Sequence, residues 1–412
     1  MLRPLAGVRV LEIGENLSAA FGARLLGDLG AEVIKIERPE GDPSRRRGPF
    51  LPAAPALSES AFFGYLNHGK RSVALDLATT AGAGLARDLA ERCDLLIYDP
   101  QALAGAGGFD PAAAAWRARP TTVAASLYGL VGPRAGLPGS LFVLQHAAGF
   151  AFHQASPVHD PEATPPVGCA DWEATLMVGL VAALAAMSAL RAAGETRPGP
   201  LIDLSAEDAL AYLLVEPFAD WRAGAEVARR RRAAGETVTI AGGLVWLLPC
   251  ADGTVLVSPR EDHQWERWVA VMGHPAWCAD AALCGTRERR KENALALQRR
   301  MAEWSAGRRC RDVFAKAQES RVACFPVSSP RDLLANEQLI HRRFFSHLAA
   351  GTAAGIPIPG LPFQMTTPDG EALERGCSVT MPALGEGTGE ILGATLRPRP
   401  AAAARRAGSR AR

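Results

Sequence analysis

The sequence predicts an α/β protein with a Rossmann-like open sheet in a large domain and a second, smaller α+β domain. Strand-like and helix-like segments alternate up to about Ser126, which is typical of a parallel sheet covered by helices. The length of 412 residues exceeds what one hydrophobic core usually supports, so two domains are expected. Near residue 225 the alternation gives way to a hairpin pattern and tryptophan-containing helix patterns, which predicts where the second domain begins.

The opening of the chain predicts a βαβ unit. Segment 8–13 alternates like a strand, and Phe21, Leu25 and Leu26 recur at helical spacing in the segment that follows. Gly30 ends that helix before a second strand. Short connections of this kind join parallel strands. In all, we predict strands at 8–13, 31–37, 72–77, 94–98 and 121–126, and helices at 19–29 and 81–92.

Open parallel sheets bind ligands beyond the carboxyl ends of their strands. The loops after Ile13, Glu37, Leu77 and Tyr98 are therefore the expected binding edge. A nicotinamide or flavin site would need G-x-G-x-x-G in the first of these loops, whereas segment 14–20 contains a single glycine. The chain also lacks the phosphate loop of nucleotide hydrolases and the G-x-S-x-G elbow of serine hydrolases.

The second half of the chain predicts a small domain and a returning C-terminal segment. A strand at 236–240 is followed by the pair Gly242-Gly243, a hairpin at 244–249 and 254–258, a helix with Trp265 and Trp268, and a charged helix at 287–302. Repeated prolines in 355–363 predict an extended segment without regular structure. The predicted organisation is a large domain at 1–215, a small domain at 225–327, a returning segment at 328–396 and a disordered basic tail at 397–412.

Composition excludes several classes of partner. The net charge of +2 is too small to indicate a nucleic-acid partner, and six arginines lie in the tail. The eight cysteines form no C-x-x-C pair, so we expect neither a disulfide framework nor a metal site. The first residues lack the apolar stretch of a signal peptide, which favours a cytoplasmic location.

Asp171 stands directly before a long apolar run. Segment 174–190 is almost entirely Ala, Val, Leu, Met and Gly, and it is shorter than the roughly 20 residues of a membrane span, so it predicts a buried core helix. At the N-cap of that helix, free backbone N–H groups and the helix dipole would keep Asp171 ionised. Such a carboxylate can be a plain cap or a nucleophile, and its position leaves both open.

Basic residues flank two of the predicted strands. Arg38 follows the second strand, and Lys70 and Arg71 precede the third. If the long connection between these strands folds back toward Arg38, the cations would suit a ligand that carries phosphates. Alternatively, Lys70 and Arg71 are solvated surface charges.

Several stretches resemble family III CoA-transferases of the CaiB/BaiF type. They lie in order at 4–12, 25–39 and 67–77, and the resemblance continues through Ala170-Asp171, 250–253, Gln264-Trp265 and 382–388. It covers nearly the whole chain up to about Leu396. The resemblance implies an intertwined homodimer, with a heteromer as an alternative, and acyl-CoA and a carboxylic acid as substrates. No permanently bound cofactor and no membrane partner are implied.

By resemblance, Asp171 is the nucleophile that moves CoA to an acid through an aspartyl anhydride and an aspartyl-CoA thioester. Gly242-Gly243 matches the glycine loop that covers these intermediates, although a simple turn before a strand fits the pair equally well. The CoA contacts implied by the resemblance are Ser18, Arg38, Asn67, His68, Gly69, Lys70, Arg71 and Asp99.

The chain departs from the family at three places. The family's Ala-Gly-Pro in the first turn is Ser18-Ala19-Ala20, and its Asn-Phe after the fourth strand is Asp99-Pro100. Acyl-CoA racemases of the family have a His where Ser140 stands, so two-base proton transfer lacks one partner. A CoA-transferase is the preferred hypothesis, and the alternatives are a non-catalytic partner subunit and, less favoured, a racemase or epimerase.

Overall fold

The chain divides into two compact units. The computed structural model describes residues 1–51, 60–103, 105–154, 160, 163–166, 168, 171–193, 197–214, 244–349 and 355–395. The large unit combines Met1–Phe150, Cys169–Leu214 and Gln338–Arg412, and the small unit combines Ala151–Gly168 with Val215–Glu337. The predicted strand at 236–240, the pair Gly242-Gly243 and the basic tail lie outside the described residues.

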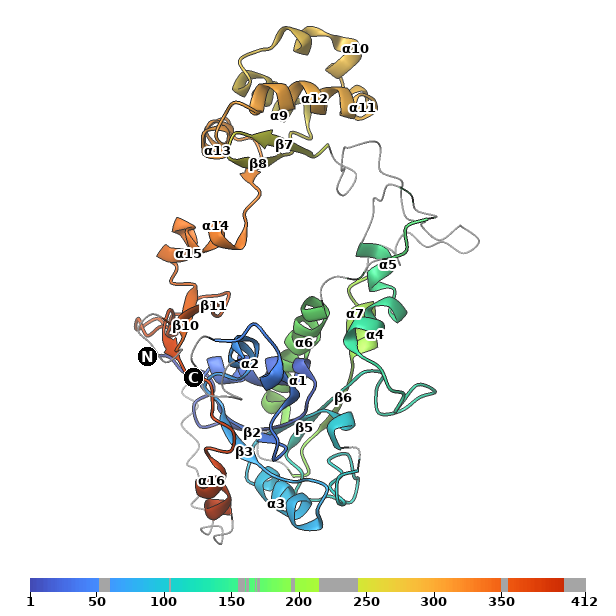
Figure 1. The fold of residues 1–412 in the computed structure, drawn as a ribbon, viewed down its shortest axis with the longest axis vertical. Helices are drawn as coiled ribbons and strands as arrows, with labels where there is room; N and C mark the ends of the chain where they lie inside the picture. Colours follow the sequence, from blue (N-terminus) through green and yellow to red (C-terminus); the bar gives the residue numbers. More distant parts are fainter. Residues whose placement is uncertain are drawn as a thin grey trace. The chain divides into compact units, whose positions relative to one another are not determined.

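Six parallel strands form the central sheet of the large unit (Figure 1). Their order, β3-β2-β1-β4-β5-β6, is that of doubly wound dinucleotide-binding sheets, and the predicted Rossmann-like α/β fold is confirmed. The last strand, β6, was not predicted from the sequence. The strands are β1 (Arg9–Ile13), β2 (Glu32–Glu37), β3 (Arg71–Ala74), β4 (Leu95–Tyr98), β5 (Thr121–Ser126) and β6 (Leu201–Ser205).

Helices cover both faces of this sheet (Figure 1). One buried cluster joins alternate strand residues to α1 (Leu17–Asp28), α4 (Leu141–Ala147), α6 (Asp171–Ala193) and α7 (Ala206–Ala211). The other cluster joins the opposite strand residues to α3 (Thr80–Glu91) and α16 (Thr388–Thr395). The shorter elements of the large unit are η1 (Pro43–Arg46), α2 (Ala61–Asn67) and η2 (Pro100–Leu103), while α5 (Phe150–Gln154) and α15 (Glu337–His341) each contain residues of both units.

Helix α6 is longer and less enclosed than predicted. It has 23 residues, and Asp171 is its first helical residue rather than the cap before it. The side chains of Ala174, Val178 and Ala182 are buried, whereas Leu180 is 56% exposed, so only one face is covered. By length and composition, Trp172–Ala193 could also cross a membrane, a property that core helices of soluble proteins share.

The small unit contains a three-stranded antiparallel sheet packed on helices. Its hairpin was predicted, and so was a helix with buried Trp265 and Trp268. Its strands are β7 (Trp246–Cys250), β8 (Gly253–Val257) and β9 (Cys324–Pro326). Its helices are α9 (Asp262–Val271), η3 (Ala276–Ala279), α10 (Ala281–Cys284), α11 (Arg287–Glu292), α12 (Ala294–Ser305), α13 (Cys310–Glu319) and α14 (Pro330–Leu334).

The prediction of a single helix at 287–302 is wrong, because the helix is interrupted at Asn293. The Asn293 amide donates to the carbonyl groups of Ala282, Leu283 and Arg289. A side chain that bonds nearby backbone in this way competes with helical hydrogen bonds. One helix therefore ends and another begins at this residue.

The prediction that 355–363 has no regular structure is also wrong. Residues Ile356–Pro359 form the edge strand β11, antiparallel to β10 (Phe345–Leu348), with β12 (Ser378–Val379) on the other side. Pro357 and Pro359 alternate with the two isoleucines, so the positions without an N–H donor face away from the neighbouring strand. An edge strand can tolerate proline in this register.

Candidate functional site

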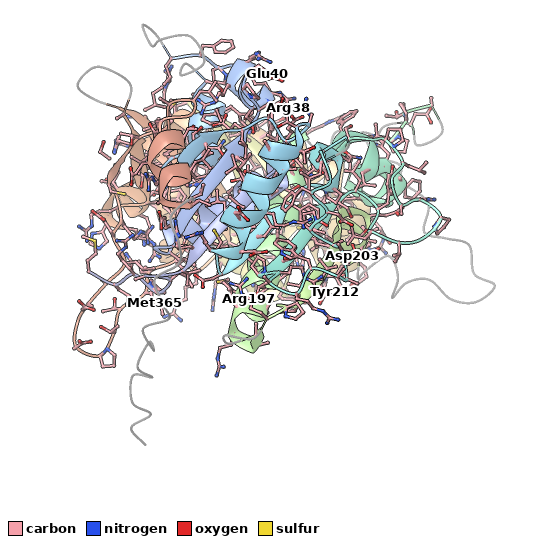
Figure 2. The ribbon with its side chains drawn as sticks, turned by 90° about the horizontal axis from the view of Figure 1, so that it is seen from below. Arg38, Glu40, Arg197, Asp203, Tyr212 and Met365 are labelled. Carbon is pink, nitrogen blue, oxygen red and sulfur yellow. The ribbon has the colours of Figure 1, made fainter. Side chains whose placement is uncertain are left out.

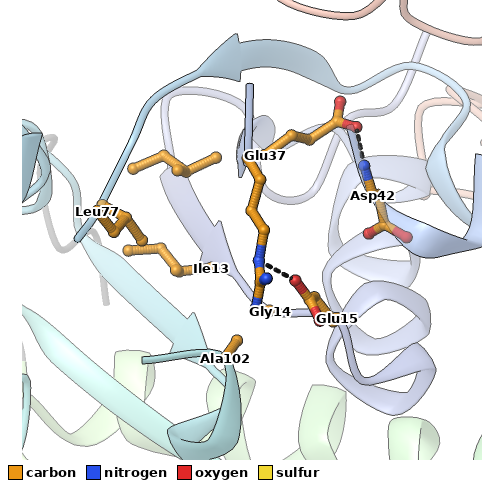
Figure 3. Close-up of a pocket in the computed structure, with 9 residues that line it drawn as sticks. Ile13, Gly14, Glu15, Glu37, Asp42, Leu77 and Ala102 are labelled. Atoms are coloured by element: carbon orange, nitrogen blue, oxygen red, sulfur yellow. Dashed lines mark hydrogen bonds and ion pairs between the residues drawn. The ribbon is translucent and has the colours of Figure 1, made fainter. Parts of the chain in front are cut away.

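The carboxyl ends of β1 and β2 border a small pocket (Figure 3). This is the edge at which the sequence predicted a ligand. A Cβ atom on Gly14 would lie 3.0 Å from the Cβ of Asp99, so a larger residue would crowd the place where the turn after β1 meets the end of β4. The pocket is lined by Ile13, Gly14, Glu15, Ile36, Glu37, Arg38, Asp42, Leu77 and Ala102.

Arg38 follows β2 directly and keeps a half-exposed side chain. Its Nε forms an ion pair with Glu15, marked by a dashed line at Glu15 in Figure 3. The Arg38 side chain is 53% exposed and that of Glu15 is 31% exposed. Figure 2 shows Arg38 close to Glu40 at this end of the sheet. Arg38 is therefore within reach of an anionic ligand, but Glu15 already neutralises it.

Asp99 fastens the end of β4 to the turn after β1. It is buried, and its Oδ1 accepts the N–H of Gln101 at 2.9 Å. Burial raises the pKa of Asp99 to about 6, and the nearby Glu15 carboxylate adds to the rise, while the N–H groups of Gln101 and Asn16 oppose it. Asp99 is thus a carboxyl group that changes charge at mildly acid pH.

Ser18 lies in the first turn of α1, beside the same edge. Its side chain is buried, and its hydroxyl donates to Oδ1 of Asn16, the residue that caps α1. Ser18 therefore contributes to the helix cap. Ser18, Arg38 and Asp99 are the predicted contacts that the structure brings to the carboxyl edge.

A row of charged and polar side chains crosses the sheet next to the pocket. Glu12, Lys35 and Ser72 are register neighbours on β1, β2 and β3, and all three are buried. The Nζ of Lys35 lies 2.7 Å from Oε1 of Glu12 and 2.8 Å from Oδ2 of Asp42. Burial alone would raise the pKa of Glu12, but the ammonium groups of Lys35 and Lys70 outweigh it and hold the pKa below its ordinary value.

A second buried ion pair joins this row to the C-terminal segment. Arg45 donates through Nε and Nη2 to both carboxylate oxygens of Glu37, at 2.6 and 2.7 Å. The same Nη2 donates to the carbonyl of Pro382 at 3.1 Å, and the N–H of Gly385 donates to Ser72 at 2.9 Å. The segment that follows β12 is therefore fixed against the first three strands.

Lys70 lies at the opposite edge of the sheet from Arg38. Arg71 pairs with Ile34, so the backbone of Lys70 is about 16 Å along the strands from the backbone of Arg38. The connection does not bring the backbone of Lys70 back to Arg38, because adjacent parallel strands begin at one edge of the sheet and end at the other. The Nζ of Lys70 instead donates to Glu12 at 2.6 Å and to Ala20 and Asn67 at 2.8 Å.

The residues next to Lys70 in the sequence also interact with other residues of the protein. Burial lowers the pKa of His68 to about 3, with Arg24 and Lys70 adding to the effect, so the imidazole is neutral. Gly69 has a φ of 71°, and Arg71 pairs with Glu32 and Glu390. A ligand role for Lys70 would require the loss of three buried hydrogen bonds.

An aromatic contact that was not predicted from the sequence lies at the start of α6. The ring centroids of Trp172 and Phe62 of α2 are 3.9 Å apart, and the Arg47 guanidinium lies 4.4 Å from the centre of the Trp172 ring. Trp172 directly follows Asp171, whose backbone is described but whose side chain is not. The run of three arginines at 45–47 was the available sequence signal.

The remaining site predictions concern the racemase alternative and metals. Ser140 caps α4, with its hydroxyl accepting the N–H of Val143. Within the part of the chain that the structure describes, no group of three or more His, Cys, Asp or Glu residues could hold a metal ion.

Residues 5–388 match CoA-transferase family III. Succinyl-CoA:(R)-benzylsuccinate CoA-transferase subunit BbsE from Thauera aromatica is 31% identical over 397 residues, or 93% of this chain and 92% of the relative. The succinyl-CoA–L-malate CoA-transferase alpha subunit from Chloroflexus aurantiacus is 26% identical and covers 94% of this chain and 88% of its own length. Mouse (Mus musculus) succinyl-CoA:glutarate CoA-transferase is 27% identical, with coverage of 87% and 80%.

Solved structures share the fold. A CaiB/BaiF family protein from Brucella suis superposes with a TM-score of 0.79 at 25% identity, over 96% of this chain and all of the other. Rv3272 from Mycobacterium tuberculosis has a TM-score of 0.69 at 20% identity, over 94% and 99% of the two chains.

Proposed function

Because this chain belongs to CoA-transferase family III, we propose that it transfers CoA from an acyl-CoA thioester to a carboxylic acid with Asp171 as the nucleophile. The observation that carries the proposal is the position of Asp171, at the first residue of the 23-residue helix α6 and within the matched range. The first N–H groups of a helix have no helical acceptor, and its dipole favours negative charge there. These groups stabilise the carboxylate and can donate hydrogen bonds to the oxyanions that develop during the reaction.

The proposed reaction proceeds through four exchanges at one carboxylate. Asp171 attacks the thioester carbonyl, and the new C–O bond gives an acyl-aspartyl anhydride as the C–S bond breaks and CoA leaves as the thiolate. The thiolate attacks the aspartyl carbonyl, which gives aspartyl-CoA thioester and the free donor acid. The acceptor carboxylate attacks this thioester, and a new C–O bond gives a second anhydride, between the acceptor acid and Asp171, as the C–S bond breaks and the thiolate leaves again. The thiolate then attacks the acceptor carbonyl, which yields the new acyl-CoA and regenerates Asp171.

We propose succinyl-CoA as the donor. The names of the related benzylsuccinate, malate and glutarate transferases all contain succinyl-CoA, and the acceptors that they name are also dicarboxylic acids. Arg38 and Asp99 remain the proposed CoA contacts that fit the carboxyl edge best. Asn67, His68, Gly69, Lys70 and Arg71 lie at the other edge, so we propose that they hold the fold there.

Trapping of the covalent intermediate tests this function. The protein is mixed with succinyl-CoA and treated with hydroxylamine or borohydride, and mass spectrometry of peptides is expected to find the modification on Asp171. Asp171→Asn should abolish the adduct. Glu173→Gln, which changes an exposed carboxylate on the same helical turn, should leave it intact. Wild-type protein that forms no adduct with a broad panel of acyl-CoA esters would refute the proposal.

A partner-subunit role is the second candidate. The names of the Thauera and Chloroflexus relatives describe them as subunits, which favours assembly with a second chain. A non-catalytic subunit would bind a partner and give no adduct by itself. Co-expression with a second family member, followed by the same trapping, separates this role from that of a homodimer.

A further inference from the structure

We propose that Cys250 and Cys310 form a site of reversible oxidation, at which a peroxide joins the two thiols in a disulfide bond. The bond fastens the turn between β7 and β8 to the start of α13, within the small unit. This inference goes beyond the proposed transfer of CoA and does not depend on it. It adds a modification site and the class of reagent that acts there.

The hairpin and the helix bring the two cysteines together. Cys250 is the last residue of β7 and lies directly opposite Gly253, the first residue of β8. The Cβ positions of two such opposed residues are about 4.5–5.5 Å apart. A Cβ atom on Gly253 would lie 3.3 Å from the Sγ of Cys310. The sulfur of Cys310 therefore reaches the end of the hairpin at which Cys250 stands.

Backbone contacts fix the turn against the start of α13, whose first residue is Cys310. Oδ1 of Asp252 accepts the N–H of Cys310 at 2.7 Å, and Oδ2 of Asp252 lies 3.4 Å from Nε of Arg309. The N–H of Ala251 donates to the carbonyl of Arg308 at 2.8 Å. Because these contacts lie on both sides of the two thiols, the folded small unit keeps the cysteines close together.

The two thiols interact through a side-chain hydrogen bond. Burial raises the pKa of Cys250, and the hydrogen bond with Cys310 opposes the rise. Burial raises the pKa of Cys310 to about 12, and hydrogen bonds with Asp252 and Cys250 add to the rise. Cys310 is therefore the donor, and Cys250 is the sulfur that loses its proton more readily.

The other described cysteines of the small unit have different surroundings. Cys284 and Cys324 are buried, whereas Cys250 and Cys310 are both partly exposed, so a small oxidant can reach them. Cys278 is also partly exposed, but the thiol of its neighbour Cys284 is buried and donates to the carbonyl of Cys278 at 3.3 Å. Cys278 is therefore a suitable control.

Two exchanges at sulfur account for the reaction. The Cys250 thiolate attacks one oxygen of hydrogen peroxide, and an S–O bond forms as the O–O bond breaks and hydroxide leaves to take up a proton. The Cys310 sulfur attacks the resulting sulfenic acid, and the S–S bond forms as the S–O bond breaks. The departing hydroxide takes the Cys310 proton and leaves as water. Two thiols lose two electrons in all, and one peroxide is reduced to two waters.

Peptide mapping tests the site. Full-length protein is treated with hydrogen peroxide at pH 8.5, where a larger fraction of each thiol is ionised than at pH 7, and is then unfolded, alkylated and digested. We expect a peptide pair joined through Cys250 and Cys310, a loss of two alkylatable thiols per chain, and recovery of both after dithiothreitol. Cys278→Ser should form the same disulfide.

Single serine variants test the assigned roles. Cys310→Ser should stop the reaction at a sulfenic acid on Cys250, which dimedone traps, and Cys250→Ser should give much less dimedone adduct on Cys310. Oxidised wild-type protein without the joined peptide pair, or with a disulfide between other cysteines, overturns the inference. More adduct on Cys310 than on Cys250 in these variants overturns the assignment of the attacking sulfur. None of these measurements uses CoA, so their failure and that of adduct formation at Asp171 are distinguishable.

Discussion

Gly22 of α1 lies directly against Gly179 of α6. A Cβ atom on Gly22 would be 3.0 Å from the carbonyl oxygen of Gly179, and one on Gly179 would be 2.8 Å from the carbonyl oxygen of Ser18. Two helices approach this closely only where side chains are missing from both. Because Gly179 is about two turns after Asp171, the contact sets the position of the helix that carries the proposed nucleophile.

Gly179→Ala should therefore destabilise the large unit. The added methyl group meets backbone that cannot move aside, and overpacking of this kind costs about 1–3 kcal/mol. Denaturant unfolding measures the loss. Gly84→Ala on α3 is the control, since nothing lies within 4 Å of its Cβ position, and we expect it to gain about 0.5–1 kcal/mol. Equal effects of the two changes would contradict the close packing.

Asp99→Asn should change how stability depends on pH. The pKa of Asp99 is about 6 in the folded protein against an ordinary value of 3.8. The folded state therefore binds a proton that the unfolded state has lost between about pH 4 and 6, and the stabilising contribution of this group falls as pH rises through that window. Asn cannot ionise, so relative to wild type the variant should gain up to about 3 kcal/mol between pH 4 and 7.5.

Unfolding in denaturant at several pH values checks this prediction. Asp88→Asn removes an exposed carboxylate on α3 and serves as the control, which should follow the wild-type curve. A difference between Asp99→Asn and wild type that stays constant with pH would show that Asp99 does not titrate in this range.

Glu15→Gln should strengthen CoA binding. The change frees Arg38 from its ion pair and removes one carboxylate from the carboxyl edge. Because both side chains are partly exposed, we expect a modest gain, about two- to fivefold in affinity, that shrinks at high salt. Titration calorimetry with CoA measures it. Glu40→Gln, an exposed neighbour of Arg38, should have little effect, and weaker binding by Glu15→Gln would contradict the prediction (Figure 2).

Glu12→Gln should be one of the most damaging single changes in the sheet. It leaves the ammonium groups of Lys35 and Lys70 buried with one anionic partner fewer, and breaking a buried pair costs about 3–5 kcal/mol. The melting temperature and denaturant midpoint should both fall. Glu32→Gln, whose partly exposed side chain pairs with Arg9 and Arg71, should cost less than about 1 kcal/mol.

The sheet was predictable because its signals are local. The alternation in 8–13 and the glycine at residue 30 mark a strand and a helix end wherever the chain goes afterwards. β6 was missed because it lies between a long helix and a short one, and its five residues include an aspartate. β11 was missed because a strand can contain Pro357 and Pro359 only if their side without an N–H group has no neighbouring strand. That depends on tertiary structure, which the local sequence does not show.

The candidate site was less predictable than the sheet. The sequence made Asp171, Arg38 and the carboxyl edge candidates, since a helix start and strand ends are local features. It could not tell that Lys70 turns inward to Glu12, because the pairing joins residues 58 positions apart. Nor could it tell which of three adjacent arginines would meet Trp172.

The bond from Arg45 to Pro382 has a consequence for biosynthesis. The two residues are 337 positions apart, and the large unit contains both, so it cannot be completed until the ribosome has released almost the whole chain. Most of the small unit is a single continuous stretch, and domains generally fold as units during synthesis. The part of the protein that is translated first is therefore the part that finishes folding last. Glu37 and Arg45 reach their final contacts only after the C-terminal segment has been synthesised.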